Sequence, residues 1–233
     1  MTSKLFTFLL VTLALTSHAL GAAFDWQRDI HSPMDSYSIV DLQWEGKIFP
    51  DGENVTLFGE DFKAVLTQIR ALNPNWVAPI LPDEEKASFV KRQVNGYFCG
   101  VYATAPIGEV YDQINYLKSL GNTACTVAGR SCVRNGCMNN GAIYMCNDNP
   151  NQLSLSCQGV RIYAEDATDR CTRSGAPCGG TGPVGARSPV SAQIFPAYYP
   201  GLNVLTGYSN CGDSPTKRPN EYDAPGPFGR CWS

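Results

Sequence analysis

Three stretches of the chain place apolar residues three and four positions apart, which is the spacing of one face of an α-helix. They predict helices over residues 62–72, 107–120 and 156–171. Pro106 is suited to the start of the second helix, and Gly121 is suited to cap its C-terminus.

Shorter apolar runs predict strands around these helices. Residues 42–49 and 55–58 flank the turn sequence Pro50-Asp51-Gly52, which is typical of a hairpin. Further strands are expected at 97–102, 141–146, 194–195 and 203–206, and residues 125–137 are expected to form a cysteine-rich loop. The pattern predicts an α+β fold, a compact disulfide-stabilised domain with a helix–strand–helix core and Gly/Pro-rich loops.

The first residues have the pattern of a secretory signal peptide, predicted over 1–21. Lys4 supplies the positive charge, an apolar run over 5–15 follows, and Ala19-Leu20-Gly21 fits the small-x-small cleavage rule. The apolar run is too short to be a transmembrane helix, which needs about 20 residues. The protein is therefore expected to be secreted.

The cysteines divide the rest of the chain. None occurs in residues 22–98, and a dibasic pair, Lys91-Arg92, lies seven residues before Cys99. A kexin-type protease cuts secreted pro-proteins after such a pair, although a chance surface pair is the alternative. The expected organisation is a cysteine-free pro-domain over 22–92 and a mature cysteine-rich domain over 93–233.

The charge distribution follows the same division. Residues 22–92 hold 12 acidic and 7 basic side chains, whereas residues 93–233 hold 9 acidic and 10 basic ones. An acidic pro-domain could assist folding or solubility, and it carries a glycosylation sequon at Asn54. With a net charge of −3, the chain has no basic excess for nucleic-acid binding.

An even number of cysteines behind a signal peptide predicts a disulfide framework. Spacing alone does not choose among the possible pairings. Cys132 and Cys137 have a zinc-ligand spacing, but no second pair matches it, so neither a metal nor a cofactor is predicted. The ten cysteines are Cys99, Cys125, Cys132, Cys137, Cys146, Cys157, Cys171, Cys178, Cys211 and Cys231.

The distribution of histidine argues against an enzyme. His18 and His31 both precede the predicted cut, which leaves the mature part without Ser-His-Asp or Cys-His chemistry. A carboxylate pair is the remaining route, as in glycoside hydrolysis. Of the candidates, those on the third helix are expected to form a solvated face, and Asp148 to cap a turn or that helix. The candidates are Glu109, Asp112, Asp148, Glu165, Asp166, Asp169, Asp213, Glu221 and Asp223.

Tyrosines are numerous in the mature part, and tyrosine is enriched at binding interfaces. Simple packing is expected for Tyr102, Tyr144 and Tyr163. Three others lie in the loop-rich C-terminal region and are candidate partner-binding residues: Tyr198, Tyr199 and Tyr208.

The signal, cysteine-free pro-segment, Lys-Arg pair and cysteine-rich domain together resemble fungal secreted effectors matured by a kexin protease. The sequence from Cys137 to Asn149, with Cys146-Asn147-Asp148-Asn149 after a strand, is similar to a segment recurring in small secreted fungal proteins. The helix–strand–helix order resembles necrosis-inducing-factor effectors and fungal killer toxins over residues 97–171. The tail departs from that pattern, and no catalytic residue carries over.

The resemblance implies a monomeric secreted effector or necrosis-inducing toxin that binds a host plant protein in the apoplast after kexin-type maturation. One alternative is an antimicrobial or killer-type toxin against competing microbes. Another is a secreted glycosidase that uses two carboxylates.

Overall fold

The structure is a computed structural model that describes residues 38–79, 93–100, 102–173, 185 and 187–212. Contacts divide the chain into Met1–His31 and Ser32–Ser233, and only the second unit contains described residues. Several predicted features therefore lie outside the described residues: the signal peptide, Lys91, Arg92, Cys178, Cys231, Asp213, Glu221 and Asp223.

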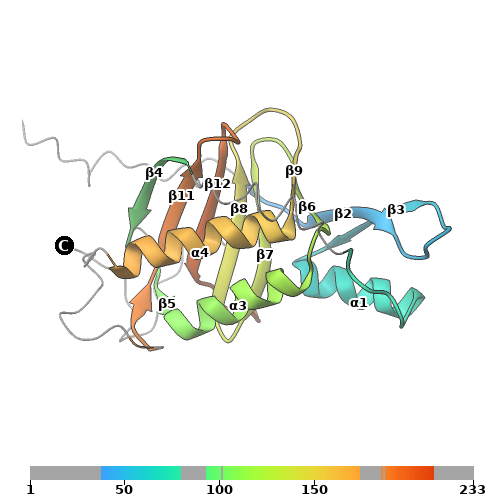
Figure 1. Ribbon diagram of the computed structural model, residues 1–233, viewed down its shortest axis with the longest axis horizontal. Helices are drawn as coiled ribbons and strands as arrows, with labels where there is room; N and C mark the ends of the chain where they lie inside the picture. Colours follow the sequence, from blue (N-terminus) through green and yellow to red (C-terminus); the bar gives the residue numbers. More distant parts are fainter. Residues whose placement is uncertain (1–37, 80–92, 101, 174–184, 186, 213–233) are drawn as a thin grey trace, which may run out of the picture. The chain divides into compact units, whose positions relative to one another are not determined.

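The described part is a mixed fold of helices and strands, as expected (Figure 1). Its helices are α1 (Phe62–Leu72), α3 (Ile107–Ser119) and α4 (Cys157–Arg173). The larger sheet has the spatial order β1 (Ser38–Ile39), β7 (Ser131–Met138), β8 (Gly141–Asn147), β12 (Leu202–Tyr208), β11 (Ala192–Pro196) and β4 (Val94–Cys99). Its neighbouring strands are antiparallel except for the parallel pair β1–β7.

Two smaller sheets complete the arrangement. One has the order β3 (Asn54–Gly59), β2 (Leu42–Lys47), β6 (Ala124–Val127) and β9 (Leu153–Ser156). The other pairs β10 (Pro189–Val190) with β5 (Ala105–Pro106). The predicted hairpin is confirmed, because β2 and β3 pair from Leu42↔Gly59 to Lys47↔Asn54.

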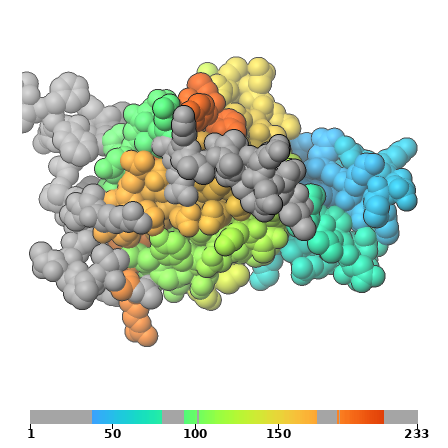
Figure 2. Space-filling model, in the orientation of Figure 1, coloured from blue at the N-terminus to red at the C-terminus, as the bar shows by residue number. Residues whose placement is uncertain are grey.

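Helices α3 and α4 lie side by side over one face of the larger sheet, and both appear in the space-filling view (Figure 2). Successive side chains of each strand point to opposite faces of the sheet. In β8, Ile143 and Met145 belong to the main hydrophobic core with the helices, whereas Tyr144 and Cys146 belong to a second buried cluster. The sheet therefore has buried side chains on both faces.

The three predicted helices are confirmed, with ends close to those expected. In α1 the Asp61 side chain accepts a hydrogen bond from the Ala64 amide at 3.0 Å, which caps the N-terminus. In α4 the Ser156 hydroxyl accepts one from the Gly159 amide at 3.0 Å. Asp148 therefore does not cap this helix, because strand β9 lies between them.

The predicted loop over 125–137 is wrong, because this stretch contains part of β6 and most of β7. Four strands separate α3 from α4, so the simple helix–strand–helix core is not confirmed. Polar side chains such as Arg134 and Asn135 interrupt the apolar pattern of this stretch, yet both are fully buried. They lie in a strand that pairs with β8 and has an irregular register between Arg134 and Gly136.

The described part of the chain contains four disulfides: Cys99–Cys171, Cys125–Cys157, Cys132–Cys146 and Cys137–Cys211. The first joins the edge strand β4 to α4, and the third joins the neighbouring strands β7 and β8. The expected disulfide framework is thus confirmed for eight of the ten cysteines.

A separate pro-domain is not confirmed. Leu42, Trp44 and Phe62 belong to the same hydrophobic core cluster as Ile114 and Val133 of the cysteine-rich part. The N-terminal strands β1 and β2 also pair with β7 and β6. The core residues of 38–79 are therefore buried against the rest of the chain rather than only against one another.

Candidate functional site

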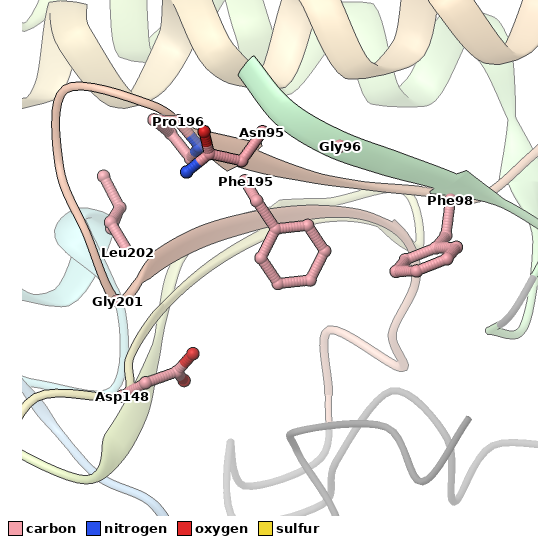
Figure 3. A pocket seen from close by; sticks show the side chains of 8 residues that line it. All are labelled: Asn95, Gly96, Phe98, Asp148, Phe195, Pro196, Gly201 and Leu202. Atoms are coloured by element: carbon pink, nitrogen blue, oxygen red, sulfur yellow. The ribbon is translucent and has the colours of Figure 1, made fainter. Parts of the chain in front are cut away.

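A small pocket opens beside the strand ends of β4, β8, β11 and β12 (Figure 3). Its volume is about 260 Å³. Sites that enclose a whole drug-sized ligand have volumes of about 300–1,000 Å³, so this pocket suits one side chain or one ring of a larger partner. It is lined by Asn95, Gly96, Phe98, Asp148, Phe195, Pro196, Gly201 and Leu202.

Asn147 organises the turn that carries Asp148 into the pocket. Its buried side-chain amide donates to the carbonyls of Ala128, at 3.2 Å, and Asn151, at 2.7 Å. Its oxygen accepts from the Asn149 backbone amide at 3.0 Å. These bonds fix the backbone on both sides of Asp148, as the turn-forming Asn-Asp-Asn sequence predicts.

Two further bonds hold this turn against the loop between β11 and β12. The Asp148 backbone amide donates to the Gly201 carbonyl at 2.7 Å, and the Asn149 side-chain amide donates to the Pro200 carbonyl at 2.8 Å. Gly201 has φ +80°, and a Cβ there would lie 2.6 Å from the Asn149 nitrogen. Only glycine fits this position without strain.

A chain of hydrogen bonds runs through the sheet to the carboxylate of Asp148. The Tyr102 hydroxyl donates to the Gln193 side chain at 2.7 Å, and Gln193 donates to Asn203 at 3.0 Å. Asn203 then donates to Oδ1 of Asp148 at 3.2 Å. Because each of these donors points toward Asp148, the bonds polarise one another and favour the ionised carboxylate.

Burial acts in the opposite direction on this carboxylate. Partial removal from water raises the pKa of Asp148 above its usual value, while the Arg130 charge and the Asn203 hydrogen bond offset part of the increase. Among the described residues no cation forms an ion pair with Asp148. The site therefore holds a partly desolvated carboxylate that would gain from a cationic partner.

Aromatic rings form another wall of the pocket. Phe98 and Phe195 pack edge to face, with ring centroids 5.8 Å apart. Figure 3 shows the Asp148 carboxylate turned toward the Phe195 ring, with Asn95 on the neighbouring strand. A carboxylate next to aromatic faces can bind a cation by charge and by cation–π attraction.

The other candidate acids within the described ranges lie on helices away from this lining. Glu109 and Asp112 are on α3, where burial and the Asp112 charge raise the pKa of Glu109. On α4, Glu165 pairs with Arg161 at 3.4 Å. The structure therefore does not add a second carboxylate to the residues that line the pocket.

The predicted solvated acidic face on the third helix is wrong for Asp166, which is 8% exposed. Asp166 pairs with Arg170 at 3.1 Å, and Asp169 accepts a hydrogen bond from the Tyr111 hydroxyl of α3. Asp169 therefore links α4 to α3, whereas the Asp166–Arg170 pair lies within α4.

The candidate tyrosines do not form one surface. Tyr198 is 56% exposed in the β11–β12 loop, whereas its neighbour Tyr199 packs edge to face on Tyr163 at 6.2 Å. Tyr208 is at the far end of β12, opposite Gly141, and contacts the main core. Only Tyr198 combines exposure with a position near the pocket. The packing expected for Tyr102, Tyr144 and Tyr163 is confirmed by their burial.

Asn54, the predicted glycosylation site, is exposed at the start of β3. Within the described ranges, no group of three or more His, Cys, Asp or Glu residues could hold a metal ion. None of the helices searched there is long and apolar enough to cross a membrane.

Sequence reasoning identified Asp148 but missed its surroundings. Gln193 and Asn203 each interrupt an apolar strand sequence, which is a signal for a buried polar network. Phe98 and Phe195 are nearly 100 positions apart, and the antiparallel pairing of β4 with β11 brings them together, with Phe195 opposite Gly96.

Comparison with known proteins does not identify a relative. No family model, curated protein or solved structure matches the chain. The resemblance to kexin-processed fungal effectors stays an expectation.

Proposed function

We propose that this protein is a secreted fungal effector that acts by binding a host plant protein after kexin-type cleavage behind Lys91-Arg92. The pocket at Asp148 would take a cationic side chain of that target. The observation that carries this proposal is a single half-buried carboxylate in a pocket that is also lined by a pair of phenylalanine rings.

Three properties of the pocket support a cationic side chain as its occupant. The Asn203 side chain donates a hydrogen bond to Oδ1 of Asp148, and no hydrogen bond to Oδ2 is observed among the described residues. The rings of Phe98 and Phe195 add cation–π attraction, and the volume of about 260 Å³ suits one side chain. Arginine fits best, because it combines a planar cation with a frequent role as an interface hot spot.

Binding is favoured over hydrolysis by the number of carboxylates. Glycoside hydrolysis in most families needs two carboxyl groups about 5–9.5 Å apart. Asp148 is the only acid among the residues that line the pocket. The hydrogen bond from Asn203 lowers the pKa of Asp148 but burial raises it by more, so the preference for binding depends on the number of carboxylates alone.

The disulfides support an extracellular setting. Four bonds are formed within the described part of the chain, and such bonds persist in oxidising compartments. Asp148 reaches the pocket through a strand held by Cys132–Cys146. Reduction is therefore expected to abolish binding along with the fold.

Leaf infiltration tests the proposal directly. The purified chain without residues 1–21, cut by a kexin-type protease, is infiltrated in oxidised and reduced forms across a panel of plant genotypes. We expect cell death in some genotypes with the oxidised form only. A chain with Lys91→Ala and Arg92→Ala, treated in the same way, is expected to be inactive.

A pair of variants separates the pocket from general charge. Asp148→Asn removes the charge but leaves an oxygen for Asn203, so it is expected to abolish the response. Asp51→Asn, in the exposed β2–β3 turn, is expected to leave it unchanged. Equal activity of both variants would contradict the proposed site. Absence of any plant response, with inhibition of microbial growth, would favour the antimicrobial alternative.

A further inference from the structure

Residues 38–79, here called the N-terminal segment, supply part of the main hydrophobic core. Five of its core side chains are at most 2% exposed, although the segment contains only one helix and three short strands. They share a continuous cluster with residues of α3, β7 and β8 in the cysteine-rich part. The five residues are Leu42, Trp44, Phe62, Val65 and Ile69.

Backbone pairing joins the two parts as well. Strand β2 pairs with β6 at Gln43↔Thr126, so the four-stranded sheet contains strands from both parts. Strand β1 pairs with β7, and the Val40 amide donates to the Cys132 carbonyl at 2.9 Å. Removal of the segment would expose the edges of two strands, which is unfavourable in an extracellular protein.

Electrostatics give an independent sign of this contact. The pKa of Tyr116, on α3, is raised to about 12 by burial and by the Asp61 charge, with Arg70 acting in the opposite direction. Asp61 and Arg70 lie at the two ends of α1. Charges of the N-terminal segment therefore act on a side chain of the cysteine-rich part.

Covalent connection is limited to the backbone. Residues 22–92 contain no cysteine, and the four observed disulfides all lie between Cys99 and Cys211. A cut behind Arg92 would leave the N-terminal segment held only by its strand pairings and its buried side chains.

We infer that the matured protein is a noncovalent two-chain complex, in which the N-terminal segment stays bound to the cysteine-rich chain as a structural subunit. This inference rests on the proposed cut. The surface of the cysteine-rich chain at α3, β6 and β7 is then an interaction surface, and its partner is the chain's own residues 38–79. Cleavage changes the connectivity while the shared core stays intact.

The test uses the chain without residues 1–21 after cleavage by a kexin-type protease. We expect two fragments on denaturing gels with or without reductant, and one peak containing both in size-exclusion chromatography without denaturant. Elution of the N-terminal fragment as a separate species would overturn the inference. Absence of cleavage would instead contradict the proposed maturation.

A second variant of the chain makes the retention test independent of cleavage by the kexin-type protease. It carries the recognition sequence of an unrelated protease between Arg92 and Gln93, and it is cut and analysed in the same way. Co-elution supports the inference even if the kexin-type protease fails, and separation overturns it.

Matched phenylalanine variants test whether the core holds the fragment. Phe62 is fully buried, and Phe58 is 56% exposed. Phe62→Ala is expected to weaken retention at least about 100-fold, and Phe58→Ala less than about threefold. Circular dichroism of the uncut chains checks folding, and Ile69→Val replaces Phe62→Ala if the latter does not fold. Equal retention in all variants would contradict the proposed contact.

Discussion

Gly201→Ala is predicted to destabilise the protein through the turn that shapes the pocket. The substitution forces an L side chain into φ +80° and places its Cβ 2.6 Å from the Asn149 amide nitrogen. The left-handed backbone costs about 1–2 kcal/mol. Loss of the hydrogen bond from Asn149 to Pro200 adds about 1 kcal/mol, so the expected total is about 2–3 kcal/mol.

Urea unfolding monitored by circular dichroism measures this change. Gly96→Ala is the matched control, because Gly96 lines the same pocket and a Cβ there meets no atom within 4 Å. Replacement of this strand glycine by alanine is expected to leave stability unchanged or to raise it by about 0.5 kcal/mol. A loss below about 0.5 kcal/mol in Gly201→Ala, or equal losses in both variants, would refute the role assigned to the turn.

Three other predictions concern stability. Replacement of both Cys132 and Cys146 by alanine removes a disulfide whose cysteines are 14 positions apart. The greater entropy of the unfolded chain is expected to lower the free energy of unfolding by about 3 kcal/mol, and an unchanged urea unfolding curve would contradict this prediction. The pKa of Tyr116 is raised from 10 to about 12 in the folded protein. The neutral phenol therefore contributes its full share of the free energy of unfolding below pH 10, and this share is lost as the pH rises to 12. In Tyr116→Phe the free energy of unfolding should therefore fall by about 1–2 kcal/mol less between pH 9 and pH 12 than in the unmodified protein, which unfolding at the two pH values would measure. Because the folded pKa of Asp148 is raised, its ionisation opposes folding as pH rises above 3.8, so Asp148→Asn should raise Tm at pH 7 but not at pH 3. An equal effect on Tm at both pH values would show that charge is not the cause.

The helices were predictable because their packing is local in sequence. The apolar positions Phe62, Val65 and Ile69 recur at helical spacing, and all three are fully buried against the core. The β2–β3 hairpin was predictable for a similar reason, since its turn residues and apolar runs are adjacent in the chain.

The strands that pair over long distances could not be predicted. Strand β7 contains Ser131, Arg134 and Asn135, all of which are buried by packing that the sequence pattern does not reveal. The candidate site depends on the same pairings, because its acid follows β8 while its rings lie on β4 and β11. Asp148 was a candidate by its chemistry, but its place opposite Phe195 follows from tertiary structure.

The strand order of the larger sheet has a consequence for how the protein folds. Ser38 pairs with Ser131, and Cys99 pairs with Ala192, so each pairing joins residues more than ninety positions apart. Such topologies fold slowly because the entropy of closing long loops is lost before the contacts form. The local exceptions in this sheet are the β11–β12 hairpin and the β7–β8 hairpin, and in β7–β8 Met138 lies opposite Gly141 and Cys132 is bonded to Cys146.

The β7–β8 hairpin is therefore expected to form early during synthesis and to make the first native disulfide. Strand β12 pairs directly with β8, so the sheet cannot extend toward β11 and β4 until the last third of the chain has been synthesised. During that interval Cys137 lacks its native partner, because Cys211 follows β12 in the chain. Efficient oxidative folding of the protein should then depend on disulfide isomerase activity.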